Sequence, residues 1–112
     1  IEGWLDCGKP ETMLETNRYL LTKMDKKYEF DGDVKIIHPV FIGENVKIEN
    51  SIIGPYATIN NNCHIKGSKI KDSIINSHTI IVDSILHESL VGEHCKIHNQ
   101  SKKLYLGEFS EI

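Results

Sequence analysis

The chain has 112 residues, of which 39% are hydrophobic and 26% are charged, and these values are typical of one globular domain. A net charge of −3 argues against nucleic acid or an anionic membrane as partner, because both need clustered lysine and arginine. No apolar run approaches the roughly 20 residues that span a bilayer, and no signal peptide is visible, so we expect a cytoplasmic protein. Three cysteines without CxxC spacing predict reduced thiols and neither a disulfide framework nor a structural metal site.

A single α-helix is predicted over residues 10–24. Pro10 suits the first helical position, and Glu11 places negative charge at the positive end of the helix dipole. Asn17 and Arg18 fall outside the apolar stripe that should face the core. That stripe consists of Met13, Leu14, Leu20, Leu21 and Met24. The segment "DKKYEFDGD" that follows is charged and contains a glycine, so it predicts a linker.

From residue 34 onward the sequence repeats. The phrase "NSIIGPYATI" at 50–59 recurs as "DSIINSHTII" at 72–81 and as "DSILHESLVG" at 83–92. Aliphatic residues recur every five or six positions, with a larger period of about 17, and this spacing excludes the 3.6-residue period of a helix. The repeating positions are Ile36, Ile42, Ile48, Ile53, Ile59, Ile65, Ile70, Ile75, Ile80 or Ile81, Leu86, Val91 and Ile97.

Three short sides of this kind close one triangular coil, with aliphatic side chains stacked inside. Ala57, Cys63 and Cys95 occupy a position where a larger side chain would crowd the interior. The corners call for residues that tolerate positive φ, and the candidates are Asn45, Asn50, Asn61 and Asn62. We therefore predict a mainly β fold, a single-stranded left-handed parallel β-helix of about four coils over residues 34–99, preceded by one α-helix.

The two later cysteines test the register of these coils. Cys63 and Cys95 lie 95 − 63 = 32 residues apart, which places them on the same side of the prism, two coils apart. Their Cα atoms should then be roughly 9 to 10 Å apart, too far for a disulfide. The position between them is predicted to be Ser73, Ile74 or Ile75.

These motifs carry a family resemblance. "VKIENSIIGPYATINNNCHIKGSKIKDSII", "DSILHESLVGEHCKI" and "LYLGEFSEI", in this order, resemble the carboxy-terminal β-helix of long-form glucose-1-phosphate thymidylyltransferases, which are sugar-phosphate nucleotidylyltransferases. "GWLDCGKPETMLETNRYLL" at 3–21 is similar to the last strand and the following helix of that family's catalytic domain. Cys7 stands where the family usually has threonine. The resemblance implies that residues 1–30 end a catalytic domain and include a linker, and that residues 31–112 form the β-helix domain with a strand tail.

The resemblance also implies a function for the parent protein. Such an enzyme transfers a nucleotidyl group from dTTP or UTP to a hexose 1-phosphate, releasing pyrophosphate and an NDP-sugar of the dTDP-glucose or UDP-glucose type. Asp6 matches one of the family's two carboxylates that hold Mg²⁺. The family's glycine-rich loop, sugar-phosphate clamp and other carboxylate have no match in this sequence. We therefore expect the isolated chain to bind no Mg²⁺, to be inactive, and to serve assembly.

The expected partners are the chain's own upstream catalytic domain and further copies of itself, as a trimer or dimer formed through the β-helix flanks or the tail. Two other functions remain open. In hexapeptide-repeat acyltransferases a histidine acts as general base, and the candidates here are His64, His78 and His87. The second is a zinc site like that of a related fold, which needs three histidines that converge from neighbouring faces. The candidates are His94 and His98, which lie four residues apart in a strand-rich coil rather than on a helix.

Overall fold

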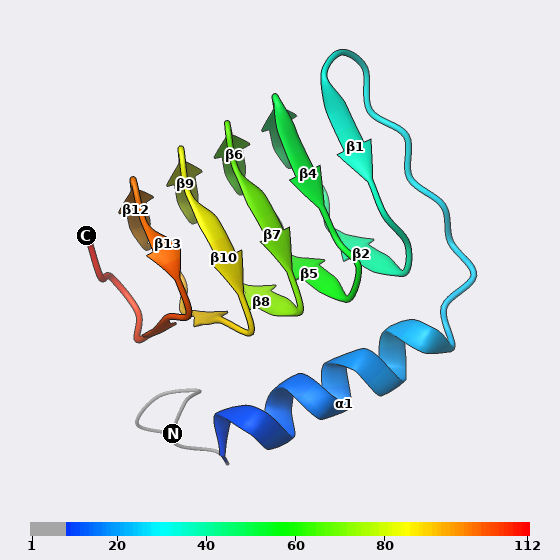
Figure 1. The fold of residues 1–112 in the computed structure, drawn as a ribbon, viewed down its shortest axis with the longest axis horizontal. Coiled ribbons are helices and arrows are strands. Elements are labelled where there is room, and N and C mark those ends of the chain that lie inside the picture. The colour runs from blue at the N-terminus through cyan, green and yellow to red at the C-terminus, as the bar shows by residue number, and fades with distance from the viewer. Residues whose placement is uncertain (1–8) are drawn as a thin grey trace.

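The computed structural model describes residues 9–112 and shows one helix followed by fourteen short strands in that part of the chain (Figure 1). The helix α1 spans Pro10–Thr22. The strands are β1 (Val34–Ile36), β2 (Val40–Ile42), β3 (Lys47–Glu49), β4 (Ser51–Ile53), β5 (Ala57–Ile59), β6 (His64–Lys66), β7 (Lys69–Lys71), β8 (Ser73–Ile75), β9 (Ile80–Val82), β10 (Ile85–His87), β11 (Leu90–Val91), β12 (Lys96–His98), β13 (Ser101–Lys102) and β14 (Tyr105–Leu106).

Every third strand joins the same parallel sheet, so the chain winds as a three-sided prism. Sheet A has the order β1-β4-β7-β10-β13, sheet B β14-β11-β8-β5-β2, and sheet C β12-β9-β6-β3. From β7 to β9 the chain runs down the front, along the bottom and up the back of the prism while it advances toward the left of the view (Figure 1). This is a left-handed coil, and it confirms the predicted parallel β-helix.

Strands β1 to β12 form the four predicted coils, and the tail adds part of a fifth. β13 pairs with β10, β14 pairs with β11, and Glu111 bridges to Lys96, so the tail completes its own chain's solenoid. Lys47 pairs with His64, His64 with Ile80, Ile80 with Lys96 and Lys96 with Glu111, so successive turns take 17, 16, 16 and 15 residues.

The core consists of three aliphatic stacks, one behind each sheet. The period identified nearly all of their members, and the choice between Ile80 and Ile81 is settled because Ile81 is fully buried and Ile80 is exposed. The stacks are Ile36, Ile53, Ile70 and Leu86 behind sheet A, Ile42, Ile59, Ile75, Val91 and Leu106 behind sheet B, and Ile48, Ile65, Ile81 and Ile97 behind sheet C.

Corner residues have positive φ, as expected, but asparagine fills only some of the corners. Asn45, Asn50 and Asn62 are confirmed, whereas Asn61 is not among the positive-φ residues. Larger and charged side chains take the same conformation at equivalent corners of other coils. They are Tyr56, Asp72, His78, Asp83, Glu88, His94 and Phe109.

A small polar residue follows most corners and is buried inside the turn. Ser84, for example, donates its hydroxyl to the carbonyl of Val82 at 3.0 Å and accepts the N–H of Gln100, one coil further on, at 3.1 Å. Each serine hydroxyl thus links its own corner to the next coil and is itself hydrogen-bonded although it is buried. The three ladders are Ser51, Ser68 and Ser84 before sheet A, Ser73 and Ser89 before sheet B, and Cys63, Thr79 and Cys95 before sheet C.

The cysteine register is confirmed with one correction. Cys63 and Cys95 precede β6 and β12, which are separated by β9, so they lie on the same side two coils apart, and both are free. The residue between them is Thr79, not Ser73, Ile74 or Ile75. The predicted residues form β8, which belongs to sheet B and not to the side of the prism that holds the cysteines.

Helix α1 lies along the outer face of sheet B and crosses several coils (Figure 1). Leu21 is buried, but Leu20 is 56% exposed, so only part of the predicted apolar stripe contacts the sheet. Asn17, which was expected outside that stripe, faces the sheet and accepts the hydroxyl hydrogen of Thr58. Among the described residues, no helix is long and apolar enough to cross a membrane.

The predicted linker covers the first coil. Tyr28 and Phe30 pack against the core, and the Tyr28 backbone N–H donates to Nε2 of His38 at 3.0 Å. The Tyr28 and His38 rings are stacked, with an interplanar angle of 8°. The linker therefore shields the end of the prism at which the solenoid begins.

Candidate functional site

The metal ligand proposed from the sequence, Asp6, lies outside the described residues, as does the rest of the "GWLDCG" motif. The described residues do contain all six histidines and therefore every candidate for the two alternative sites. The arrangement of these histidines decides how much support those alternatives receive.

The three candidate general bases lie on different parts of the prism. His64 is on the outer face of sheet C, where Nε2 lies 2.6 Å from a carboxylate oxygen of Glu49. His78 occupies the corner between sheets B and C. His87 ends β10 on sheet A. Within one chain the three imidazoles therefore build no common site.

His78 and His94 occupy equivalent corners of successive coils and stack on each other. Both have positive φ, and their rings stack on each other at 4.7 Å between centroids. His94 stacks in turn on Phe109 at 4.8 Å, so the three rings form a ladder with the spacing of successive coils. His98 lies outside this ladder, and within residues 9–112 no three metal-ligating side chains converge on one point.

Cys63 and Cys95 are poor nucleophile candidates. Burial raises the pKa of both the Cys63 and the Cys95 thiol. The Cys63 thiol donates to the carbonyl of Asn76 at 3.1 Å, and Cys95 makes the equivalent contact with Gly107. A protonated, buried thiol of this kind has a structural role.

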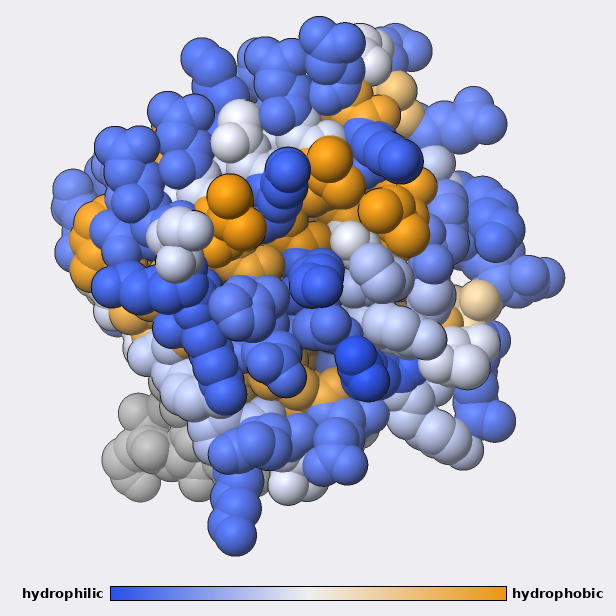
Figure 2. Space-filling view, viewed as in Figure 1, coloured by the Kyte–Doolittle hydropathy of each residue, from blue (hydrophilic) through white to orange (hydrophobic). Residues whose placement is uncertain are grey.

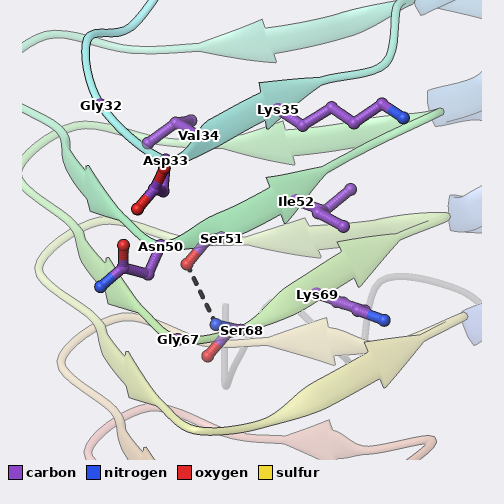
Figure 3. Close-up of a pocket in the computed structure, with 10 residues that line it drawn as sticks. All are labelled: Gly32, Asp33, Val34, Lys35, Asn50, Ser51, Ile52, Gly67, Ser68 and Lys69. Carbon is purple, nitrogen blue, oxygen red and sulfur yellow. Dashed lines mark hydrogen bonds between the residues drawn. The ribbon is translucent and has the colours of Figure 1, made fainter.

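Two large hollows lie side by side on the outer face of sheet A. The first has a volume of about 560 Å³, and its lining includes Lys35, Ile52 and Lys69. These three side chains lie in a row on successive strands, with Ser51 and Ser68 joined by a hydrogen bond at the adjacent corner (Figure 3).

The second hollow shares Ile52 and Lys69 with the first and has a volume of about 610 Å³. Gly54 lies in its floor with φ of +101°, and a Cβ there would collide with the carbonyl oxygen of Ile37. Lys71 lines the same hollow.

Sheet A is therefore a basic and apolar surface on an acidic protein. Its outward strand positions hold Lys, Ile, His and Ser, and none holds an acidic residue. Apolar groups are visible between hydrophilic ones on the side of the molecule that Figure 2 presents. Ile37 and Ile85 are 37% and 49% exposed. Such a mixture is typical of a contact surface rather than of a catalytic pocket.

An acidic edge borders this surface where sheet A turns into sheet B. Asp72 and Glu88 occupy the corner, and Glu11 and Glu15 of α1 line the same cleft of about 220 Å³. Arg18 pairs with Asp72 at 2.8 Å, and this contact raises the pKa of Arg18. The cleft also holds Lys103, whose pKa is raised chiefly by its hydrogen bond to Tyr105 and, to a smaller extent, by Glu88 and Glu11.

The sequence did not predict this surface. Its signal was present as the residues between the buried aliphatics, namely Lys35, Ile52, Lys69 and Ile85. They are about 17 residues apart, and only the coil register brings them into one row.

Comparisons with known proteins give relatives over almost the whole chain, although no protein-family model matches it. The glucose-1-phosphate thymidylyltransferase of Streptomyces antibioticus is 27% identical over 100% of the chain. The bifunctional protein GlmU of Wigglesworthia glossinidia brevipalpis is 30% identical over 96% of the chain. The glucose-1-phosphate adenylyltransferase of Desulfitobacterium hafniense is 31% identical over 94% of the chain.

The chain spans only about a third of the length of these relatives. The matched share is 39% of the Streptomyces enzyme, 30% of GlmU and 27% of the adenylyltransferase. The names of two of these relatives give different nucleotides, so the match does not identify a nucleotide for this chain. The chain is thus similar, along nearly its full length, to the carboxy-terminal part of sugar-1-phosphate nucleotidyltransferases.

Proposed function

We propose that this chain is the β-helix part of a cytoplasmic sugar-1-phosphate nucleotidyltransferase, and that it supports and assembles a catalytic domain that precedes it. The parent enzyme would join an NTP, dTTP or UTP, to a hexose 1-phosphate and release pyrophosphate. The observation that carries the proposal is the match of 94 to 100% of the chain to three differently named enzymes, a thymidylyltransferase, an adenylyltransferase and GlmU.

The character of the described residues supports an assembly role. Their buried polar side chains are engaged in the corner ladders, their buried cysteines are protonated, and their histidines are dispersed. Their best-formed hollows lie on an open sheet face. We expect the assembly to be a homo-oligomer.

The metal chemistry would belong to the intact enzyme. Mg²⁺ would neutralise charge on the reacting phosphate oxygens. Asp6 would supply one of its oxygen ligands, because a carboxylate suits this hard cation. The remaining ligands and the groups that hold the sugar phosphate would come from the preceding domain.

Pyrophosphate release tests this proposal. The polypeptide that includes the upstream sequence should release pyrophosphate from dTTP or UTP with glucose 1-phosphate and Mg²⁺. The 112-residue chain alone should not, because the groups that position the phosphates are absent. In the long polypeptide, Asp6→Asn should greatly lower kcat, whereas the control Glu2→Gln should not.

Failure of the long polypeptide to release pyrophosphate with any NTP and hexose 1-phosphate would contradict the proposal. Acyl transfer from acetyl-CoA by the 112-residue chain would instead support the acyltransferase alternative. Variants of His64, His78 and His87 would then identify the base.

A further inference from the structure

We propose that His38 holds the linker, residues 25–33, over the first coil only while its imidazole is neutral, so that protonation of His38 releases the linker. The linker joins α1 to β1 and runs past the end of the prism at which the solenoid begins (Figure 1). Its release is a conformational change of this chain alone and is separate from the proposed enzyme activity.

A hydrogen bond joins the linker to the first coil through the His38 ring. The backbone N–H of Tyr28 donates to Nε2 of His38 at 3.0 Å. A ring nitrogen accepts a hydrogen bond only through a free lone pair, so Nε2 is unprotonated and the neutral ring carries its proton on Nδ1. An imidazolium donates from both nitrogens and accepts at neither. Protonation of Nε2 therefore replaces this hydrogen bond with two N–H groups that point at each other.

The charges beside His38 also oppose its protonation. A cavity of about 240 Å³ is lined by His38, by Lys26 and Lys27 of the linker, and by Tyr56 of the second coil. The end of α1 adds Thr22, which carries no charge. The carboxylates of the linker are exposed, and none of them is among the described residues that line this cavity; they are Asp25, Glu29, Asp31 and Asp33. A protonated His38 is therefore a third cation in this lining.

The stacking of His38 on Tyr28 does not compensate for these losses. The two rings are nearly parallel, with an interplanar angle of 8°, but their centroids are 6.4 Å apart. A cation is attracted to an aromatic face within about 6 Å of the ring centroid, so an imidazolium at the observed distance gains little. Lys26 already lies over the Tyr28 ring, with Nζ 5.1 Å from the centroid. The released linker therefore suits a charged His38 better than the bound linker does.

The bound linker is weakly held, so one hydrogen bond matters to its position. The Tyr28 hydroxyl is buried without a hydrogen-bond partner, and release returns this group to water. Phe30 is only half-buried against the core. Release is local, because α1 stays attached to sheet B through Asn17 and Thr58, and β1 stays paired with β4. A free linker thus loosens the connection between the helix and the solenoid without unfolding either.

Exchange of the Tyr28 amide hydrogen with water, measured by NMR on the 112-residue chain, tests the release. The protection factor is the exchange rate of an unstructured peptide divided by the measured rate at the same pH. It should fall about 10- to 30-fold between about pH 7.5 and about pH 5.0, because one histidine proton changes an equilibrium by at most about tenfold per pH unit. The Ile80 amide, which donates to the Cys95 carbonyl in the middle of sheet C, should stay protected.

The variant His38→Gln separates the hydrogen-bond acceptor from the charge. The glutamine side-chain oxygen accepts the Tyr28 N–H but takes up no proton, so the Tyr28 amide should be protected equally at both pH values. The matched control His98→Gln removes an exposed histidine at the end of β12 and should keep the pH dependence of the wild type.

The ring nitrogens of His38 provide a test that needs no variant. Their NMR resonances in the wild-type chain should show Nε2 without a proton at neutral pH. As the pH falls, protonation of Nε2 and loss of Tyr28 protection should have the same midpoint, because one event causes the other.

Several results would overturn the inference. They are a proton on Nε2 at neutral pH, equal protection of Tyr28 at both pH values in the wild type, or an equal loss of protection in His38→Gln. Loss of Ile80 protection together with that of Tyr28 would also contradict it, because acid would then unfold the solenoid as a whole. None of these measurements involves nucleotidyl transfer, so failure of this inference and failure of the proposed enzyme activity are distinguishable.

Discussion

Sheets A and B are built from the same coils, yet one is open and the other is covered. Ile85 and Leu90 both point outward from the fourth coil, on neighbouring sides of the prism. Ile85 is 49% exposed, whereas Leu90 is fully buried on the side of the prism along which α1 lies. Leu90 is also separate from the solenoid core, which lies behind the sheets. The repeat therefore determines which residues point inward, whereas the exposure of the outward residues depends on what covers each side of the prism.

The contact between α1 and sheet B is also polar, unlike the aliphatic stacks inside. Asn17 accepts from the hydroxyl of Thr58 and donates to the carbonyl of Tyr56. Arg18 pairs with Asp72 and lies over the Tyr56 ring, 4.9 Å from its centroid. These directional contacts fix the helix at one position along the solenoid, which apolar packing alone would leave less defined.

The largest expected effect is on the two outward aliphatic residues. Leu90→Ala should lower the free energy of unfolding by about 2 to 4 kcal/mol, because it leaves a cavity at a fully buried position. Ile85→Ala should lower it by less than about 1 kcal/mol, because the side chain is already half in water. Urea unfolding of both variants, at a concentration where the chain is monomeric, provides the comparison. Equal losses would mean that α1 does not seal sheet B in solution.

A smaller effect is expected at the polar contacts of α1. Asn17→Ala should cost about 1 to 3 kcal/mol, because the Thr58 hydroxyl and the Tyr56 carbonyl both lose a partly buried partner. Arg18→Ala should cost at most about 1 kcal/mol, because its ion pair is largely exposed. Thr16→Ala, at an exposed helix position, is the control. If Arg18→Ala proves the more harmful substitution, the cation-π contact with Tyr56 contributes more than the amide.

The smallest effect is expected on sheet C and depends on pH. The hydrogen bond from His64 lowers the pKa of Glu49 below its ordinary value of 4.5. A lowered pKa in the folded state means that the stabilisation is present above pH 4.5 and is lost as pH falls through the folded value. Glu49→Gln should therefore remove this small stabilisation above pH 4.5 and leave the stability at low pH almost unchanged, so that the acid limb of the stability profile becomes slightly flatter. A side-chain carboxyl NMR titration of Glu49 with no displacement to lower pH would contradict this account.

Inward positions were predictable because the same spacing recurs in every coil, so each buried residue indicates where the next one lies. The period identified Ile53, Ile59 and Ile65 as core, and the small residues Ala57, Cys63 and Cys95 as interior. Corner identity was harder, since backbone geometry repeated by the coils above and below imposes positive φ on residues such as Tyr56 and Glu88. The residue predicted between the cysteines was placed in β8 on sheet B, whereas Thr79 occupies that position on the side that holds Cys63 and Cys95.

Outward positions were not predictable from local sequence. Asn17 was assigned to the solvent side because periodicity sorts residues by polarity, whereas a side chain that pairs with Thr58 is buried despite being polar. The basic surface of sheet A needed the register of four strands to become visible. The candidate metal ligand Asp6 came from the family resemblance, and it stays a prediction because it lies outside the described residues.

The hydroxyl and thiol ladders at the corners have a consequence for how this chain could change length in evolution. Ser73 and Ser89 each donate one hydrogen bond within their own corner and accept one from the next coil, so the two positions are chemically equivalent. A duplicated stretch of about sixteen residues would therefore contain its own corner serines, and these could form the same hydrogen bonds to the coils on both sides. Solenoids of this kind can gain or lose whole coils by recombination, without redesign of the remaining core.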